Sequence, residues 1–156
     1  MIVQTSCRIS ASANTIWPLL CNSRMEATQS CLFGLGVPQP EQCRLSDGNG
    51  GVGSTRQCIS DRGIVEQEIL IWDEPRRLSF RMKKTDIYFR QFVHEILETF
   101  DLTPVDDATT KLTRTTNVTL RGRLQFVKHL LLLVGLKKVH RFVFRNWQRL
   151  CSEGAS

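Results

Sequence analysis

Residues 123–151, RLQFVKHLLLLVGLKKVHRFVFRNWQRLC, are the stretch of sequence that decides the fold. The stretch is dense in apolar residues and has few helix breakers, which predicts a helix. On a continuous helix with 100° per residue, the apolar residues before Gly135 would share one side with the basic residues that follow Gly135. Because glycine costs about 1 kcal/mol relative to alanine inside a helix, the sequence predicts a break at Gly135. We therefore expect an apolar arm over about 123–134 and a long final helix over about 136–151.

The basic side of the predicted final helix supplies five of the charges behind a formal net charge of +6. These residues are Lys137, Lys138, Arg141, Arg145 and Arg149. Such a face could meet an acidic partner, an anionic membrane or nucleic acid, but a solvated helix face is the simpler interpretation. Aromatic residues are not interleaved with these charges as base stacking requires, so we expect no nucleic acid partner.

The 156 residues suit a single domain, 1–156, and 41% of them are hydrophobic, as in globular proteins. The longest apolar run, 130–136, is far shorter than the ~20 residues of a membrane helix. No signal peptide pattern is present, so the cytoplasm is the expected location. The six cysteines form no CxxC pair and are expected to stay reduced. No Cys/His cluster has metal-ligand spacing, and no motif indicates a cofactor, so we expect neither.

The chain before residue 123 alternates between strands and turns after a short helical region. A strand is expected over Ile2 to Ser10, followed by one short helix through Leu20 and a second over Arg24 to Leu32. Further strands are expected over 42–46, 54–60, 64–72, 77–84, 92–102 and 110–120, separated by turns such as DGNGG and PVDDA.

The last two of these strands are the most informative. If Thr103 faces Thr109, the numbers of paired residues sum to 212, and Glu98 faces Arg114 as a cross-strand ion pair. One face of the hairpin is then apolar and the other polar. The apolar face holds Phe92, His94, Ile96, Phe100 and Leu102 opposite Leu112, Thr116, Val118 and Leu120. An antiparallel sheet with one polar face must bury the other, and only the final helix is large enough to cover it.

Three short stretches carry a resemblance to a known family. SASANTIW (10–17) is similar to its opening from strand to helix, GVGSTR (51–56) to its glycine-rich turn and arginine, and EILIWDEPRRLSF (68–80) to its acidic strand, turn and returning strand. In this order they resemble the START-like, or helix-grip, superfamily (SRPBCC), which includes polyketide cyclases/dehydrases, lipid-transport proteins and the birch-pollen-allergen fold.

The resemblance implies an α+β helix-grip fold for the whole chain. In that fold a curved antiparallel sheet of six to seven strands wraps around a long C-terminal helix, with two short helices after the first strand. It also implies a cavity for a hydrophobic ligand between the sheet and the final helix. It does not imply one activity, since members range from carriers to cyclases.

Few residues of the sequence suit acid–base chemistry. His94 is predicted on the cavity face, where it could act as a general base or orient a ligand carbonyl. A hydrogen-bonded histidine in the core or at the rim is the simpler interpretation. Glu98 and Arg114 could bind a polar head group or form a structural ion pair. His129 and His140 are expected to be exposed.

We weigh three functions on these observations. The first is a binder or carrier of a hydrophobic small molecule or lipid. The second is a polyketide cyclase/dehydratase-like enzyme that uses His94, so whether the protein is an enzyme stays open. The third is an interaction module. The residues predicted to bind the ligand are Arg56, Glu68, Leu78, Phe80, Met82, Phe92, Ile96, Glu98, Phe100, Leu112, Arg114, Thr116, Val118, Phe142, Val143 and Trp147.

The apolar arm over about 123–134 leaves its own alternatives open. It could cover the mouth of the cavity, pack on a second subunit in a homodimer, or touch a membrane surface. Arg56 and Glu68 also have a second interpretation, since they could form a surface pair instead of contacting a ligand.

Overall fold

The computed structural model describes residues 1–25, 37–46, 48–122 and 125–153, with the side chains of α3 described from residue 129 onward. The elements in chain order are β1 (Ile2–Ile9), α1 (Ala13–Cys21), β2 (Ser23–Arg24), β3 (Pro40–Leu45), β4 (Thr55–Ser60), β5 (Gly63–Asp73), β6 (Arg77–Thr85), the 3-10 helix η1 (Tyr88–Gln91), β7 (Val93–Asp106), β8 (Thr109–Leu120) and α3 (Gln125–Glu153).

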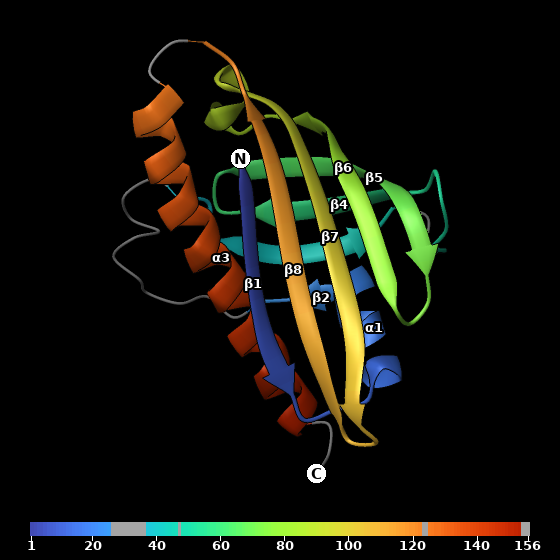
Figure 1. Cartoon of the computed structure of the whole chain (residues 1–156). Helices are drawn as coiled ribbons and strands as arrows, with labels where there is room; N and C mark the ends of the chain where they lie inside the picture. Colours follow the sequence, from blue (N-terminus) through green and yellow to red (C-terminus); the bar gives the residue numbers. More distant parts are fainter. Residues whose placement is uncertain (26–36, 47, 123–124, 154–156) are drawn as a thin grey trace.

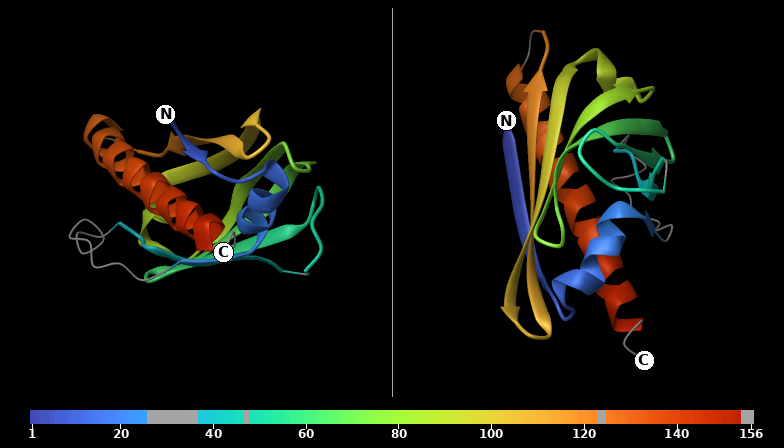
Figure 2. Two further views of the ribbon diagram at one scale, coloured as in Figure 1. Left: turned by 90° about the horizontal axis from the view of Figure 1, so that it is seen from below. Right: turned by 90° about the vertical axis from the view of Figure 1, so that its right-hand side faces the viewer.

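The strands form one antiparallel sheet in the order β1-β8-β7-β6-β5-β4-β3-β2. The sheet curls, and α3 lies across its concave side, as Figures 1 and 2 show. This arrangement confirms the predicted α+β helix-grip fold. The sheet has eight strands instead of six to seven, because the two residues of β2 add a short edge strand. Of the second predicted helix, Arg24 belongs to β2, and residues 26–32 lie outside the described residues.

The predicted break in the C-terminal helix does not occur, since α3 runs without interruption from Gln125 to Glu153. The prediction assumed that the apolar residues on both sides of Gly135 need cover. Leu130, Leu131 and Val134 instead stay 55%, 68% and 49% exposed, so one straight helix suffices. There is thus no separate apolar arm, although these residues keep the apolar character that the sequence indicated.

Gly135 gives a direct test of the continuous helix. A Cβ atom at this position would lie 3.4 Å from Cγ2 of Val37, an ordinary contact. We expect Gly135→Ala to raise the free energy of unfolding by about 0.5–1 kcal/mol, because alanine loses less backbone entropy in a helix interior. Urea denaturation measures the change. A break at Gly135 in solution would make the substitution neutral or destabilising.

The β7–β8 hairpin keeps the predicted faces but not the predicted register. Most paired residue numbers sum to 214 instead of 212, so Glu98 faces Thr116 and Phe100 faces Arg114. The turn is tighter than predicted, because both strands extend until Asp106 faces Thr109. A shift of two residues leaves side chains on their original faces wherever the pairing is regular, from Glu95 to Pro104 of β7. The alternation that the sequence predicted is therefore confirmed, and Glu98 reaches Arg114 diagonally.

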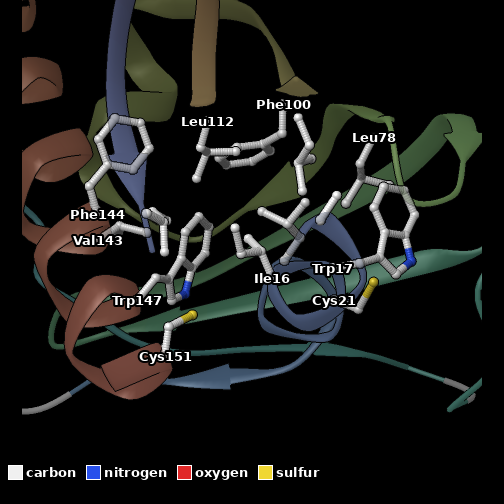
Figure 3. Packing of buried hydrophobic residues seen from close by; sticks show 14 of the residues in the cluster. Ile16, Trp17, Cys21, Leu78, Phe100, Leu112, Val143, Phe144, Trp147 and Cys151 are labelled. Carbon is white, nitrogen blue, oxygen red and sulfur yellow. The ribbon is translucent and has the colours of Figure 1, made fainter. Parts of the chain in front are cut away.

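The concave side of the sheet is packed solid at one end. There α1 and the last turns of α3 meet strands β6, β7 and β8 in one buried cluster. Figure 3 shows the residues that fill it: Ile16, Trp17, Cys21, Leu78, Phe100, Leu112, Val143, Phe144, Trp147 and Cys151. Val143 and Trp147, which the sequence predicted on the cavity side of the final helix, are both buried in this cluster.

The glycine-rich loop between β3 and β4 packs on Trp72, whose ring in turn contacts Trp17 of the buried cluster. The ring of Trp72 meets that of Trp17 edge-on with centroids 5.2 Å apart. A Cβ atom at Gly50 would lie 1.8 Å from the Trp72 ring. Only a glycine therefore lets the loop approach the indole this closely.

Alanine at position 50 should force the loop or the Trp72 ring out of place. We expect Gly50→Ala to lower the free energy of unfolding by about 1–3 kcal/mol, the usual cost of overpacking. Val52→Ala is the control, since Val52 lies in the same loop and is 70% exposed. Chemical denaturation should leave this control within about 0.5 kcal/mol of the parent protein. Equal stability of the parent and Gly50→Ala would contradict the proposed contact.

The prediction that all cysteines stay reduced is wrong for one pair. Cys43 of β3 and Cys58 of β4 lie directly opposite each other and form a disulfide. Strand pairing brings their Cα atoms to 4.2 Å, which their separation of 15 residues does not reveal. Cys7, Cys21 and Cys151 are free thiols, and burial raises the pKa of Cys21 to about 11.

Candidate functional site

A cavity of about 760 Å³ lies between the curled sheet and α3, beyond the packed end. Its walls come from β3 to β8, from the η1 region and from residues of α3 between Leu130 and Trp147. Apolar side chains dominate the wall. The polar exceptions are few and include Arg56, Gln67, Glu98 and Arg114. The curled sheet is wider than one helix can cover, so the end without α1 stays hollow.

The structure brings most of the predicted ligand-binding residues together around this cavity. Those on its wall are Arg56, Met82, Phe92, Ile96, Glu98, Phe100, Arg114, Val118, Val143 and Trp147. Leu78, Phe80 and Leu112 are instead buried behind the wall at 0–1% exposure, and Phe142 is half-buried outside it. Side chains on the concave face thus divide between the wall of the cavity and the solid core next to it.

His94 does not lie on the cavity face, contrary to the prediction. Its side chain is exposed, and Arg121 donates to its Nδ1 atom from Nη2 at 2.7 Å. The pairing of β7 with β8 shifts between Val93 and Glu95. This bulge inserts one residue and turns His94 to the outer face, which strict alternation could not predict.

Glu68 also lies outside the cavity. Its carboxylate accepts a hydrogen bond from Nε of Arg81 at 2.9 Å on the exposed face of the sheet. The inward positions of β5 belong to Gln67 and Ile69, which are buried. Glu68 lies between them and must point outward. The prediction that Glu68 binds the ligand is therefore wrong, and so is the alternative of a surface pair with Arg56, which bonds the inward-facing Gln67 instead.

Arg56 is 2% exposed and is held from several sides. Its Nε donates to the carbonyl oxygen of Leu20 at 3.0 Å, and its Nη1 donates to Oε1 of Gln67 at 2.5 Å. The guanidinium also lies over the Phe80 ring, 4.7 Å from the centroid. Burial lowers the pKa of Arg56 to about 10, so the side chain stays cationic at neutral pH.

Glu98 and Arg114 form a buried ion pair on the cavity wall. Nη2 of Arg114 donates to Oε1 of Glu98 at 2.5 Å, and Oγ1 of Thr116 donates to the same oxygen at 3.0 Å. The Arg114 guanidinium lies over the ring of Phe100, 5.2 Å from its centroid. The predicted pair is thus present, and Thr116 acts behind the wall by bonding the carboxylate.

His140 is fully buried, although the sequence predicted it to be exposed. Its Nε2 lies 2.9 Å from Oγ1 of Thr116, and its Nδ1 lies 2.8 Å from Oγ1 of Thr5. Because Thr116 gives its hydroxyl proton to Glu98, it must accept from His140. His140 therefore carries its proton on Nε2, and Thr5 donates to Nδ1. The burial of His140 could have been predicted from the helical repeat, since His140 lies on the same side of the helix as Phe144 and Trp147.

The surroundings of His140 keep its imidazole neutral. Burial first, and the positive charge of Arg114 second, lower its pKa to about 2 from an ordinary 6.5. Below about pH 6.5, His140 therefore binds a proton in the unfolded chain but stays unprotonated in the folded protein. Stability that depends on the neutral ring is present above this pH and is lost as the pH falls toward 2.

We expect the free energy of unfolding to fall below about pH 6.5, with His140 contributing up to about 1.4 kcal/mol per pH unit. His140→Gln removes this titrating group. As the pH falls from about 6.5 to 5, the free energy of unfolding of this variant should decrease less steeply than that of the parent protein. Urea denaturation at a series of pH values measures both slopes. Identical slopes would show that His140 does not titrate differently in the two states.

Several wall residues were not among the predicted site residues. From the sheet and η1 region they include Gln67, Val65, Ile59, Ile87, Tyr88 and Phe89. From α3 they include Leu130, Leu131, Val134 and Val139. The apolar run before Gly135 was a signal for the helical group. The inward position of Gln67 had no comparable signal, because bulges interrupt β5 on both sides of it.

Two absences concern the described parts of the chain. No three His, Cys, Asp or Glu side chains within the described ranges come together as metal ligands would. Among the helices described, none combines the length and the apolar character needed to cross a bilayer.

Comparisons with solved structures find the same fold. A START superfamily protein from Mycobacterium smegmatis matches with a TM-score of 0.66 and 12% identity, over 97% of each chain. The ZhuI aromatase/cyclase from Streptomyces sp. R1128 matches with a TM-score of 0.70 and 12% identity, over 100% of this chain and 96% of that one. Norcoclaurine synthase from Thalictrum flavum matches with a TM-score of 0.66 and 16% identity, over 100% and 96%.

At these identities the matches show the fold alone. No family model and no curated protein matches the sequence. The predicted START-like, helix-grip architecture is confirmed by the structural neighbours, which include both a cyclase and a synthase.

Proposed function

Since the chain has the START-like helix-grip fold, we propose that it binds or carries a hydrophobic small molecule or lipid between its sheet and α3. The cavity is the observation that carries this proposal. Its volume of about 760 Å³ lies within the range of ordinary ligand sites, roughly 300–1,000 Å³. Its mostly apolar wall with a few buried polar groups is also typical of such sites.

The exposed residues of α3 support access to the cavity. Leu130, Leu131 and Val134 are about half exposed or more, yet each also contributes to the cavity wall. They therefore mark the mouth, where an apolar ligand would complete the burial of side chains that the protein alone leaves in water.

Acid–base catalysis in the cavity has less support than binding. The predicted catalyst, His94, is exposed on the outer face. Glu98 is a carboxylate on the wall, but Arg114 and Thr116 already bond it. His140 lies behind the wall with both ring nitrogens in hydrogen bonds. A pure interaction module is the weakest alternative, because it would not need a cavity of this size.

Filling the cavity tests the proposal. Ile96 is half-buried on the cavity wall, so Ile96→Trp should occupy space that a ligand needs. We expect the affinity for Nile red, a neutral apolar dye, to fall by about tenfold or more, which corresponds to ~1.4 kcal/mol. Fluorescence titration of protein purified without detergent measures the affinity.

Leu97→Trp is the matched control, since Leu97 is the next residue of β7 and its side chain is not part of the wall. It should bind the dye like the parent protein. Circular dichroism establishes that both variants are folded. Equal dye binding by folded Ile96→Trp and Leu97→Trp, or no binding by the parent protein, would reject the cavity as the binding site.

A further inference from the structure

We propose that the ligand carries one anionic head group, a carboxylate, which Arg56 and Arg114 hold at the buried end of the cavity. This inference rests on the proposed binding function and adds the chemical class of the ligand. Its basis is an imbalance of charge. The wall residues described include two arginines and one carboxylate, Glu98, and no other Lys, Arg, Asp or Glu.

All three charged groups are removed from water. Arg56, Glu98 and Arg114 are 2%, 5% and 9% exposed. Two positive charges and one negative charge leave this region with a net charge of +1. An unpaired charge in a protein interior is costly, because it loses its hydration without gaining a counter-charge. A ligand that brings one negative charge would remove this cost.

Some hydrogen-bond donors of the two arginines are not used by the described residues. Arg114 Nε is buried and has no hydrogen-bond partner among the described residues. Arg114 uses only Nη2 toward Glu98, and Arg56 uses Nε and Nη1. Buried polar atoms are almost always hydrogen-bonded in native proteins. The free Nε therefore indicates an acceptor that the described residues do not supply.

Both guanidinium groups belong to one end of the cavity. Arg56 lies over Phe80 and Arg114 over Phe100, and these two rings are 5.9 Å apart between centroids. Guanidinium groups suit two-oxygen anions because their donors form a planar fork. The ring faces offset part of the positive charge but accept no conventional hydrogen bond, so the spare donors remain available.

Neither of the two described titratable neighbours, His140 and Cys21, supplies a second anion. His140 is neutral and reaches the pair only through Thr116 and Glu98. The thiol of Cys21 is also neutral, since burial raises its pKa to about 11. A monoanion such as a carboxylate matches a net charge of +1, whereas a phosphate monoester would bring about −1.5 to −2.

The cavity orients such a ligand. The charged groups lie at the buried end, and the exposed apolar residues Leu130, Leu131 and Val134 lie at the mouth. A molecule with a carboxylate and a long apolar tail would therefore enter head first and leave its tail between α3 and the sheet.

A pair of ligands that differ only in the head group tests the inference. Dodecanoate and dodecanol have the same tail, and each can compete with bound Nile red at pH 7.5. We expect dodecanoate to bind at least about tenfold more tightly, as charge-assisted hydrogen bonds to buried arginines require. Dodecylamine should bind more weakly than dodecanol, because its positive charge meets the same arginines.

Two variants that change the charge in opposite directions sharpen the test. Glu98→Gln raises the net charge of the region to about +2 and should increase the preference for dodecanoate over dodecanol. Arg114→Gln lowers it to about zero and should reduce that preference to within about threefold. If Arg114→Gln fails to fold, the parent protein and Glu98→Gln still decide the outcome.

The results separate this inference from the proposed function. Equal binding of dodecanoate and dodecanol by the parent protein, or displacement of bound Nile red by neither, would overturn the anionic head group and leave the cavity proposal standing. Failure of the parent protein to bind Nile red would reject both. A tenfold preference that does not change in Glu98→Gln would also overturn the assignment to these arginines.

Discussion

His140 fixes where α3 lies across the sheet. Its two ring nitrogens bond Thr5 of β1 and Thr116 of β8, so one side chain ties the middle of the helix to two neighbouring strands. Thr5 donates to His140, His140 to Thr116, and Thr116 to the carboxylate of Glu98. Arg114 neutralises this carboxylate. A neutral imidazole is required for this direction of donation, and burial provides it.

The position of α3 in turn divides the concave side of the sheet into two parts. Beyond His140, α1 and the large side chains Phe144 and Trp147 pack in one buried cluster against the sheet (Figure 3). Before it, no second α-helix among the described residues covers the sheet, and the cavity remains. The buried arginines lie between these parts, so the polar end of the cavity adjoins the solid core.

Many of the residues on the cavity wall could be predicted from the alternation of inward and outward side chains along each strand. The wall residues of β7 and β8, among them Ile96, Glu98 and Arg114, lie on the predicted face because a register shift of two residues preserves parity. His94 and Glu68 did not follow, since bulges in β7 and β5 interrupt the alternation near them. A bulge depends on how two strands meet, which a single strand's pattern does not reveal.

By itself, the sequence determined the antiparallel strands, the C-terminal helix that covers them and the apolar face between them. Periodic burial of side chains is a local property that residue order encodes directly. Only the tertiary structure decided that α3 continues through Gly135, that His140 is buried and that Cys43 meets Cys58. These outcomes depend on which distant atoms become neighbours, because packing and desolvation act between segments far apart in the chain.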